Sequence, residues 1–294
     1  MHTKAIEISI EHLRKQNTSE LIGYNNDIII GNNLGNINPL AHPIRLKAVT
    51  VLICQKGRIE GNINLKKFQI TENQLFVNYP DNIIQINRVE DAAGYAIIIS
   101  EKFLKQLKPN FRLNLDNLLN LHDNIPFNIP SEEFSYLESL YVLLSKHIKN
   151  ENFEVIKSLI LTLLHNIIAL MTHYQNSVSL DSKSNTIRSR QLFDKFIKLL
   201  NDFHTKERSL YFYADKMCLS PKYVSTMIKS YSGRTALEWI NGYVMLEARM
   251  MLHYTDMTIK EIAYNLNFPS QSAFGKYFRQ QIGVSPKKYR KMEA

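Results

Sequence analysis

The sequence reads SLYFYADKMCLSPKYVSTMIKSYSG from Ser209 to Gly233 and TIKEIAYNLNFPSQSAFGKYFRQQIG from Thr258 to Gly283, and these two stretches carry the same pattern. In each, a small Ala permits two helices to cross closely, and a Ser can open the second helix. Spaced apolar residues then mark a buried face, and a Gly can close the helix. The pattern predicts two helix-turn-helix units. The matched positions are Ala214, Met217, Leu219, Ser220, Val224, Ile228 and Gly233, and then Ala263, Leu266, Phe268, Ser270, Phe274, Phe278 and Gly283.

The residues around the predicted turns agree with this interpretation. Pro221 directly follows Ser220, at a first helical position where the missing N–H of proline costs no hydrogen bond. Asn267 ends the first helix of the second unit, where Asn tolerates a left-handed backbone. Residues 235–253 predict a linker helix between the units, with Trp239 in its core face.

These stretches resemble the AraC-type regulators (AraC/XylS family), bacterial transcription factors with two helix-turn-helix units joined by a linker helix. The resemblance covers residues 209–233, 235–253 and 258–290, and it ends in the block Gly-x-Ser-Pro-x-x-Tyr-Arg, here Gly283 to Arg290. It implies a homodimeric, sequence-specific transcription regulator whose partners are a double-stranded DNA operator and a small-molecule effector. Activation is the commoner mode in this family, and RNA polymerase is then a further candidate partner.

Charge is divided unevenly along the 294 residues. From Thr186 onward the chain holds 18 Lys and Arg against 9 Asp and Glu, whereas residues 1–185 hold 18 of each. The whole net charge of +9 therefore belongs to the C-terminal part, as expected of a DNA-binding domain. Cys54 and Cys218 lack the spacing of a disulfide framework or a metal site, which indicates a cytoplasmic protein. We expect no membrane span, because the longest apolar run is too short.

Residues 1–125 predict a β-rich domain of short strands separated by Gly, Asn, Asp and Pro. Lys56-Gly57 predicts a hairpin turn between strands at Val51–Cys54 and Ile59–Ile63. The segment resembles the small cupin-like barrel that precedes the DNA-binding half in many AraC-type regulators. Its interior is either an effector pocket or filled by Val51, Ile53, Phe76 and Ile84.

Residues 126–178 predict a helical segment. Apolar residues step by four and three along its second helix, as in a coiled-coil seam, and in the family helices at this place form the dimer interface. A helix buried wholly within one subunit is the alternative. The predicted dimerisation residues are Ile156, Ile160, Leu163, Ile167 and Leu170. Residues 179–188 predict a polar linker and 189–294 the DNA-binding domain. The expected fold class is therefore multidomain α+β, with a cupin-like β-barrel, a helical dimerisation segment and an all-α double helix-turn-helix.

The outward faces of the two second helices are the candidate DNA-reading surfaces. The resemblance assigns base contacts to Lys222, Ser225 and Thr226 on the first helix, and a backbone contact to Lys229. On the second helix the polar residues Gln271, Ser272 and Lys276 face outward as base readers, and Arg279 faces phosphate. Gly275 also faces outward, where it allows close approach but cannot discriminate bases by a side chain.

Two other functions stay open at this point. Some DNA-repair methyltransferases carry similar DNA-binding units, but neither cysteine lies in a reactive paired motif, so we expect no enzyme and no catalytic residue. Scattered histidines provide no metal-ligand set, and no cofactor motif is visible, so we expect neither a metal nor a cofactor. The third interpretation is a DNA-binding regulator without an effector.

Overall fold

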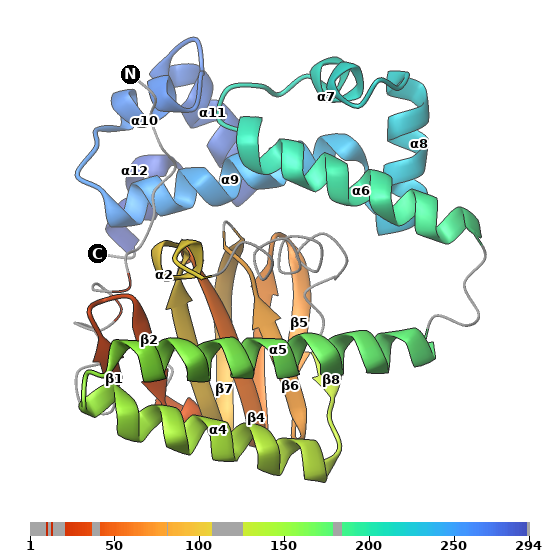
Figure 1. Ribbon diagram of the computed structural model, residues 1–294. Coiled ribbons are helices and arrows are strands. Elements are labelled where there is room, and N and C mark those ends of the chain that lie inside the picture. Colours follow the sequence, from red (N-terminus) through yellow and green to blue (C-terminus); the bar gives the residue numbers. More distant parts are fainter. Residues whose placement is uncertain are drawn as a thin grey trace. The chain divides into compact units, whose positions relative to one another are not determined.

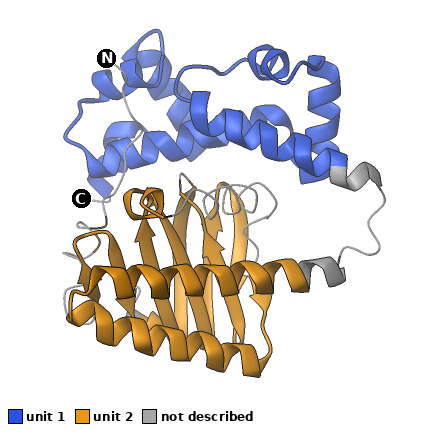
Figure 2. Cartoon of the chain, viewed as in Figure 1, with its two compact units in different colours: residues 1–6, 42–44, 182–294 blue, residues 7–41, 45–181 orange. Residues whose placement is uncertain are grey.

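The computed structural model describes residues 21–36, 42–80, 82–107, 126–178 and 184–292, together with Ile10 and Leu13. The chain forms two compact units, one built mainly from residues 45–181 and the other mainly from residues 182–294 (Figure 2). We refer to them as the N-terminal and C-terminal domains. Part of the predicted linker, residues 179–183, lies outside the described residues.

The N-terminal domain contains one eight-stranded antiparallel sheet among its described residues. The order is β1-β2-β7-β4-β6-β8, with β3 paired to β7 and β5 paired to β4. The bounds are β1 Ile22–Tyr24, β2 Ile28–Gly31, β3 Ile44–Arg45, β4 Ala48–Ile63, β5 Lys66–Ile70, β6 Gln74–Asn78, β7 Ile83–Ser100 and β8 Phe127–Asn128, with a 3-10 turn at Leu34–Asn36. This confirms the predicted β-rich domain.

The predicted hairpin at Lys56-Gly57 is wrong. Strand β4 runs continuously from Ala48 to Ile63 and pairs with β7 along its length, with register shifts on both sides of Lys56. Gly57 has φ +82°, and a Cβ there would lie 2.3 Å from the Asp91 carbonyl oxygen. The glycine therefore serves a β-bulge, which needs the same positive φ as a tight turn.

Two helices cover one face of the sheet, α4 (Ser131–Lys149) and α5 (Phe153–Val178), which run side by side across it (Figure 1). Alternate residues of β2, β4, β6 and β7 pack against them in one hydrophobic core. By length and composition α5 contains one candidate bilayer span, Phe153–His173. The buried apolar side chains of that segment belong to this core.

The predicted dimer seam is part of this core. Its five side chains are between 0% and 8% exposed within the single chain and contact the sheet and α4. Side chains already buried within one subunit cannot form the contact surface of a dimer, so these are core residues, as the alternative interpretation held. They are Ile156, Ile160, Leu163, Ile167 and Leu170.

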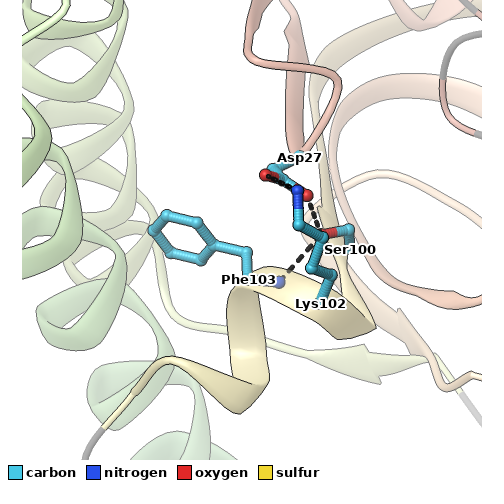
Figure 3. A network of polar contacts seen from close by, with 4 residues as sticks. All are labelled: Asp27, Ser100, Lys102 and Phe103. Carbon is cyan, nitrogen blue, oxygen red and sulfur yellow. Dashed lines mark hydrogen bonds and ion pairs between the residues drawn. The ribbon is translucent and has the colours of Figure 1, made fainter.

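A small polar network starts helix α2 (Glu101–Lys105) at the end of β7 (Figure 3). The Ser100 hydroxyl donates to the Asp27 carboxylate at 2.7 Å and accepts from the Phe103 N–H at 2.9 Å. Lys102 forms an ion pair with the same carboxylate at 3.4 Å. Every polar group shown has a partner, so the network acts as a helix cap.

The C-terminal domain is all helical in its described part. Its helices are α6 (Ser184–Phe203), α7 (Leu210–Lys216), α8 (Pro221–Ser232), α9 (Ala236–Tyr254), α10 (Ile259–Asn265), α11 (Gln271–Ile282) and α12 (Pro286–Met292). The linker helix α9 is the centre of the domain, and Trp239 on it is 1% exposed, as predicted. Buried His204, which directly follows α6, contacts α9, because its Nε2 lies 3.2 Å from the Glu247 carboxylate.

Candidate DNA-binding surface

The two helix-turn-helix units, α7–α8 and α10–α11, have the same backbone construction. Ser220 and Ser270 cap the second helices by accepting from Tyr223 N–H at 3.2 Å and Ala273 N–H at 3.1 Å. Gly233 and Gly283 end those helices in the left-handed conformation, with φ of +74° and +87°. The predicted caps are therefore confirmed.

The turns also match, including one residue that the sequence did not reveal. Asn267 has φ +54°, as predicted, and Cys218 occupies the corresponding place with φ +57°. After each, an N–H bonds back to the buried Ala of the first helix, from Leu219 at 3.0 Å and from Phe268 at 2.8 Å. The turn requires a left-handed backbone conformation at position 218, and the small side chain of Cys218 adopts it although the residue is neither Gly nor Asn.

The inner faces of α8 and α11 are those expected. On α8, Val224, Met227 and Ile228 are at most 7% exposed, and on α11 Phe274 and Phe278 are fully buried. Tyr277 is half-buried, and its hydroxyl donates to the Asn241 Oδ1 of the linker helix at 2.8 Å. This burial fixes which side of each helix faces solvent.

The predicted DNA-reading residues lie on the opposite, outward sides. All are exposed except Ser225, which is half-buried. None of the ion pairs formed between described residues involves the four cations of this set, so their charges remain available to an anionic partner. The exposed residues are Lys222, Thr226 and Lys229 on α8, and Gln271, Ser272, Lys276 and Arg279 on α11.

Three further residues on these faces were missed at the sequence level. Tyr223, next to Lys222, is 43% exposed. Gln280 of α11 and Ser285, which follows that helix, join Gly275, Lys276 and Arg279 around an open hollow of about 650 Å³. Helical periodicity predicts that Gln280 faces outward, whereas Ser285 comes close to it only through the fold.

Gly275 occupies the middle of the α11 outer face. A Cβ placed there would meet no atom within 4 Å. The glycine is therefore required neither by packing nor by a positive φ, although a helix-interior glycine costs about 0.5–1 kcal/mol relative to Ala. Its place on the candidate reading face suggests that it serves contact with a partner and not the fold.

The Gly-x-Ser-Pro-x-x-Tyr-Arg block is a structural support for this surface. Tyr289 packs against Phe278 with ring centroids 5.4 Å apart, and its hydroxyl accepts from Arg249 Nε at 2.8 Å. The Arg290 guanidinium donates to the Leu252 and Met257 carbonyls at 3.0 and 2.7 Å. Arg290 thereby binds one carbonyl in the last turn of α9 and one in the loop after it, and the block holds α12 against the second unit.

The two cysteines lie in different settings, one buried and one exposed. Burial raises the pKa of the Cys54 thiol, which favours the protonated form, and Cys54 Sγ donates to the Lys56 carbonyl at 3.3 Å. Cys218 lies in the turn of the first unit. Within the described residues, no group of three His, Cys, Asp or Glu side chains is arranged to hold a metal ion.

These observations define a protein with two helix-turn-helix units and a basic, outward-facing pair of recognition helices. Residues 213–292 match the family described as "Helix-turn-helix domain". The chain is 42% identical over 77 residues to the regulatory protein PocR of Salmonella typhimurium. The aligned segment covers 26% of this chain and 25% of that protein. It is 30% identical over 91 residues to the transcriptional activator RhaS of an Enterobacter species, covering 31% and 33% of the two chains.

Over this C-terminal part the chain is similar to transcriptional regulators of the AraC type. It spans about a quarter to a third of the length of the curated relatives given above. Among solved structures, ToxT of Vibrio cholerae aligns over 94% of this chain and 96% of that chain, at 15% identity and a TM-score of 0.43.

Proposed function

We propose that the whole protein is a sequence-specific DNA-binding transcription regulator of the AraC type that works in the cytoplasm. The observation that carries the proposal is the matched pair of capped recognition helices, each with cations and polar side chains on its solvent side. The linker helix α9 has 19 residues and is therefore roughly 28 Å long. Recognition helices separated by such a length suit major-groove segments about one turn, or roughly 34 Å, apart.

Selection of binding sites from a pool of random duplexes by the full-length protein tests this proposal. We expect an enriched site with two conserved segments about 10 base pairs apart, centre to centre. The matched control is the Lys222→Ala, Lys276→Ala double variant, which should enrich no such site. A wild-type protein that enriches no sequence would contradict the proposal.

We further propose that a small molecule binds inside the N-terminal domain and that its binding activates transcription through RNA polymerase. Thr50 and Asn78 pair directly across β4 and β6 and are 8% and 0% exposed. Neither Thr50 Oγ1 nor Asn78 Nδ2 has a hydrogen-bond partner among the residues that the structure describes. Because unpaired buried polar atoms cost about 1–3 kcal/mol each, a ligand with matching polar groups is a good reason to keep them.

A thermal-shift screen of small polar and amphipathic metabolites against the full-length protein tests this effector proposal. Compounds that raise the Tm of the wild type should fail to raise that of Thr50→Val or Asn78→Leu. A compound that shifts all three proteins equally binds elsewhere, and that result would contradict this site.

The proposed homodimer needs a surface other than the α5 seam. Helix α4 carries three exposed large hydrophobic residues, Tyr136, Val142 and Leu143, which are 68%, 40% and 44% exposed. We place the dimer contact on this face. Sedimentation should then find Tyr136→Asp with Leu143→Asp monomeric, whereas the control Lys149→Asp stays dimeric. A double variant that sediments as a dimer would overturn this placement.

A further inference from the structure

The two recognition units are joined by more than the linker helix. The segment Lys206–Arg208, which we call the bridge segment, follows α6 and precedes α7. On one side it is tied to the first unit, because the Tyr213 hydroxyl of α7 donates to the Glu207 carbonyl at 2.8 Å. The opposite side of the bridge segment contacts the second unit.

Arg208 makes that second attachment. Its Nη1 donates to the Leu266 carbonyl at 2.6 Å, and its Nη2 donates to the Asn267 carbonyl. A hydrogen bond also runs in the opposite direction, because Asn267 Nδ2 donates to the Lys206 carbonyl at 2.8 Å. These bonds join positions 58 to 61 residues apart in the sequence and end at the turn between α10 and α11. One guanidinium fork thus holds two successive carbonyls of that turn.

Aromatic packing extends this contact to the recognition helix itself. The Arg208 guanidinium carbon lies 4.0 Å from the centroid of the Phe268 ring, within cation–π range. Phe268 in turn packs on Phe274 and Tyr277, with ring centroids 5.3 and 5.1 Å apart. Both are inner residues of α11. Burial lowers the pKa of the Arg208 guanidinium, as expected for a group removed from water, although arginine stays charged.

We propose that Arg208 is a positioning residue that fixes the distance and angle between the two recognition helices, and so makes DNA binding depend on the spacing of two half-sites. This inference rests on the proposed DNA-binding function. In the folded chain, Nη1 and Nη2 of Arg208 both donate to carbonyl groups of the second unit. Arg208 therefore acts through the turn of that unit and not by touching DNA. A carbonyl-bridging arginine is poorly replaced by lysine, whose single ammonium cannot form the same fork.

The test uses the full-length protein and the duplex that the wild type selects, together with versions of that duplex carrying one base pair more or less between the two segments. One base pair moves the second segment by about 3.4 Å and turns it by about 35°. We expect the wild type to lose at least about tenfold in affinity on the altered duplexes, the equivalent of about 1.4 kcal/mol. For Arg208→Ala we expect the difference to fall below about threefold.

Arg208→Lys separates positioning from charge. Under the proposal it loses the spacing preference as Arg208→Ala does, yet keeps the wild-type dependence of affinity on salt. A phosphate-contacting arginine would give the opposite result: Ala would weaken all duplexes alike and Lys would restore them, which overturns the proposal. Unchanged spacing preference in both variants overturns it as well.

Two controls keep the outcome interpretable. Circular dichroism establishes that each variant is folded, and if Arg208→Ala is not, Phe268→Leu removes the ring below the guanidinium while keeping apolar volume, with the same expected loss of spacing preference. If the wild type selects no duplex at all, the proposed function fails. If it selects a duplex but Arg208 variants keep its spacing preference, only this inference fails.

Discussion

Replacing Gly275 by Ala should stabilise the protein and weaken its DNA binding at the same time. Gly275 lies inside α11, and a Cβ there meets no atom within 4 Å, so the added methyl group causes no clash in the free protein. The better helix propensity of Ala should raise the stability by about 0.5–1 kcal/mol. In a domain of about a hundred residues this corresponds to a Tm increase of roughly 2–8 °C.

The DNA-binding effect has the opposite sign, because the methyl group stands on the face that carries Lys276 and Arg279. If α11 approaches a base edge or the sugar-phosphate backbone at Gly275, the methyl group must move the helix outward. We expect about a tenfold loss of affinity for the selected duplex, or about 1.4 kcal/mol. The slope of affinity against salt should not change, since no charge is removed.

Thermal denaturation and fluorescence-anisotropy titrations at several salt concentrations measure both effects. Gly283→Ala is the matched control, since it also has open space but has φ +87°, where Ala is strained by about 1–2 kcal/mol. It should lower the Tm and leave the affinity of the folded protein unchanged. If Gly275→Ala raised the Tm and bound the duplex as tightly as the wild type, close approach of DNA at Gly275 would be refuted.

Other substitutions test separate parts of the molecule. Lys276→Ala should relax specificity at one or two base pairs, whereas Lys229→Ala should weaken all duplexes alike and lower the salt slope by about 1, as binding-site selection and salt titration will reveal. Glu247→Ala should destabilise the chain by about 3–5 kcal/mol in denaturant titration, because it removes the carboxylate that partners the buried His204 side chain. Glu247→Gln should cost much less, because the amide can still form a hydrogen bond with His204 Nε2; equal effects would contradict this. Thr50→Val should raise the Tm of the N-terminal domain by removing an unpartnered buried hydroxyl, and a lower Tm would mean that this hydroxyl has a partner.

The helix-turn-helix units could be predicted because their determinants are local. Ser220, Pro221 and Gly233 each act within one helical turn, and the caps they form do not depend on distant contacts. The outward faces followed from the same periodicity. Gln280 was predictable in principle as an outward residue, but its companion Ser285 lies beyond the end of α11 and gave no local signal.

Where the prediction failed, the deciding contact lies far away in the sequence. Gly57 carries the same positive φ in a bulge as in a hairpin, and only pairing of β4 with β7 about thirty residues later distinguishes the two. Ile160 and Leu163 repeat as a seam would, but an apolar helix face does not reveal whether a sheet or a second subunit covers it. In the sequence nothing distinguishes Arg208 from other cationic residues, because the Leu266 carbonyl that it binds is 58 residues away.

The two units share a backbone but differ in what they offer to DNA. On α8 the Thr226 hydroxyl already donates to the Lys222 carbonyl at 3.0 Å, so in the free protein it is an acceptor and not a donor toward DNA. Lys222 then remains the only long donor among the predicted base readers of that helix. On α11, Gln271 and Lys276 are both long and exposed, and bidentate amide or ammonium contacts discriminate bases by about 1–3 kcal/mol each. Sequence preference should therefore be stronger in the half-site under α11 than in the half-site under α8. Such a division is useful only if the weaker reader is held at a set distance from the stronger one, and the attachment of Arg208 to the turn before α11 provides that constraint.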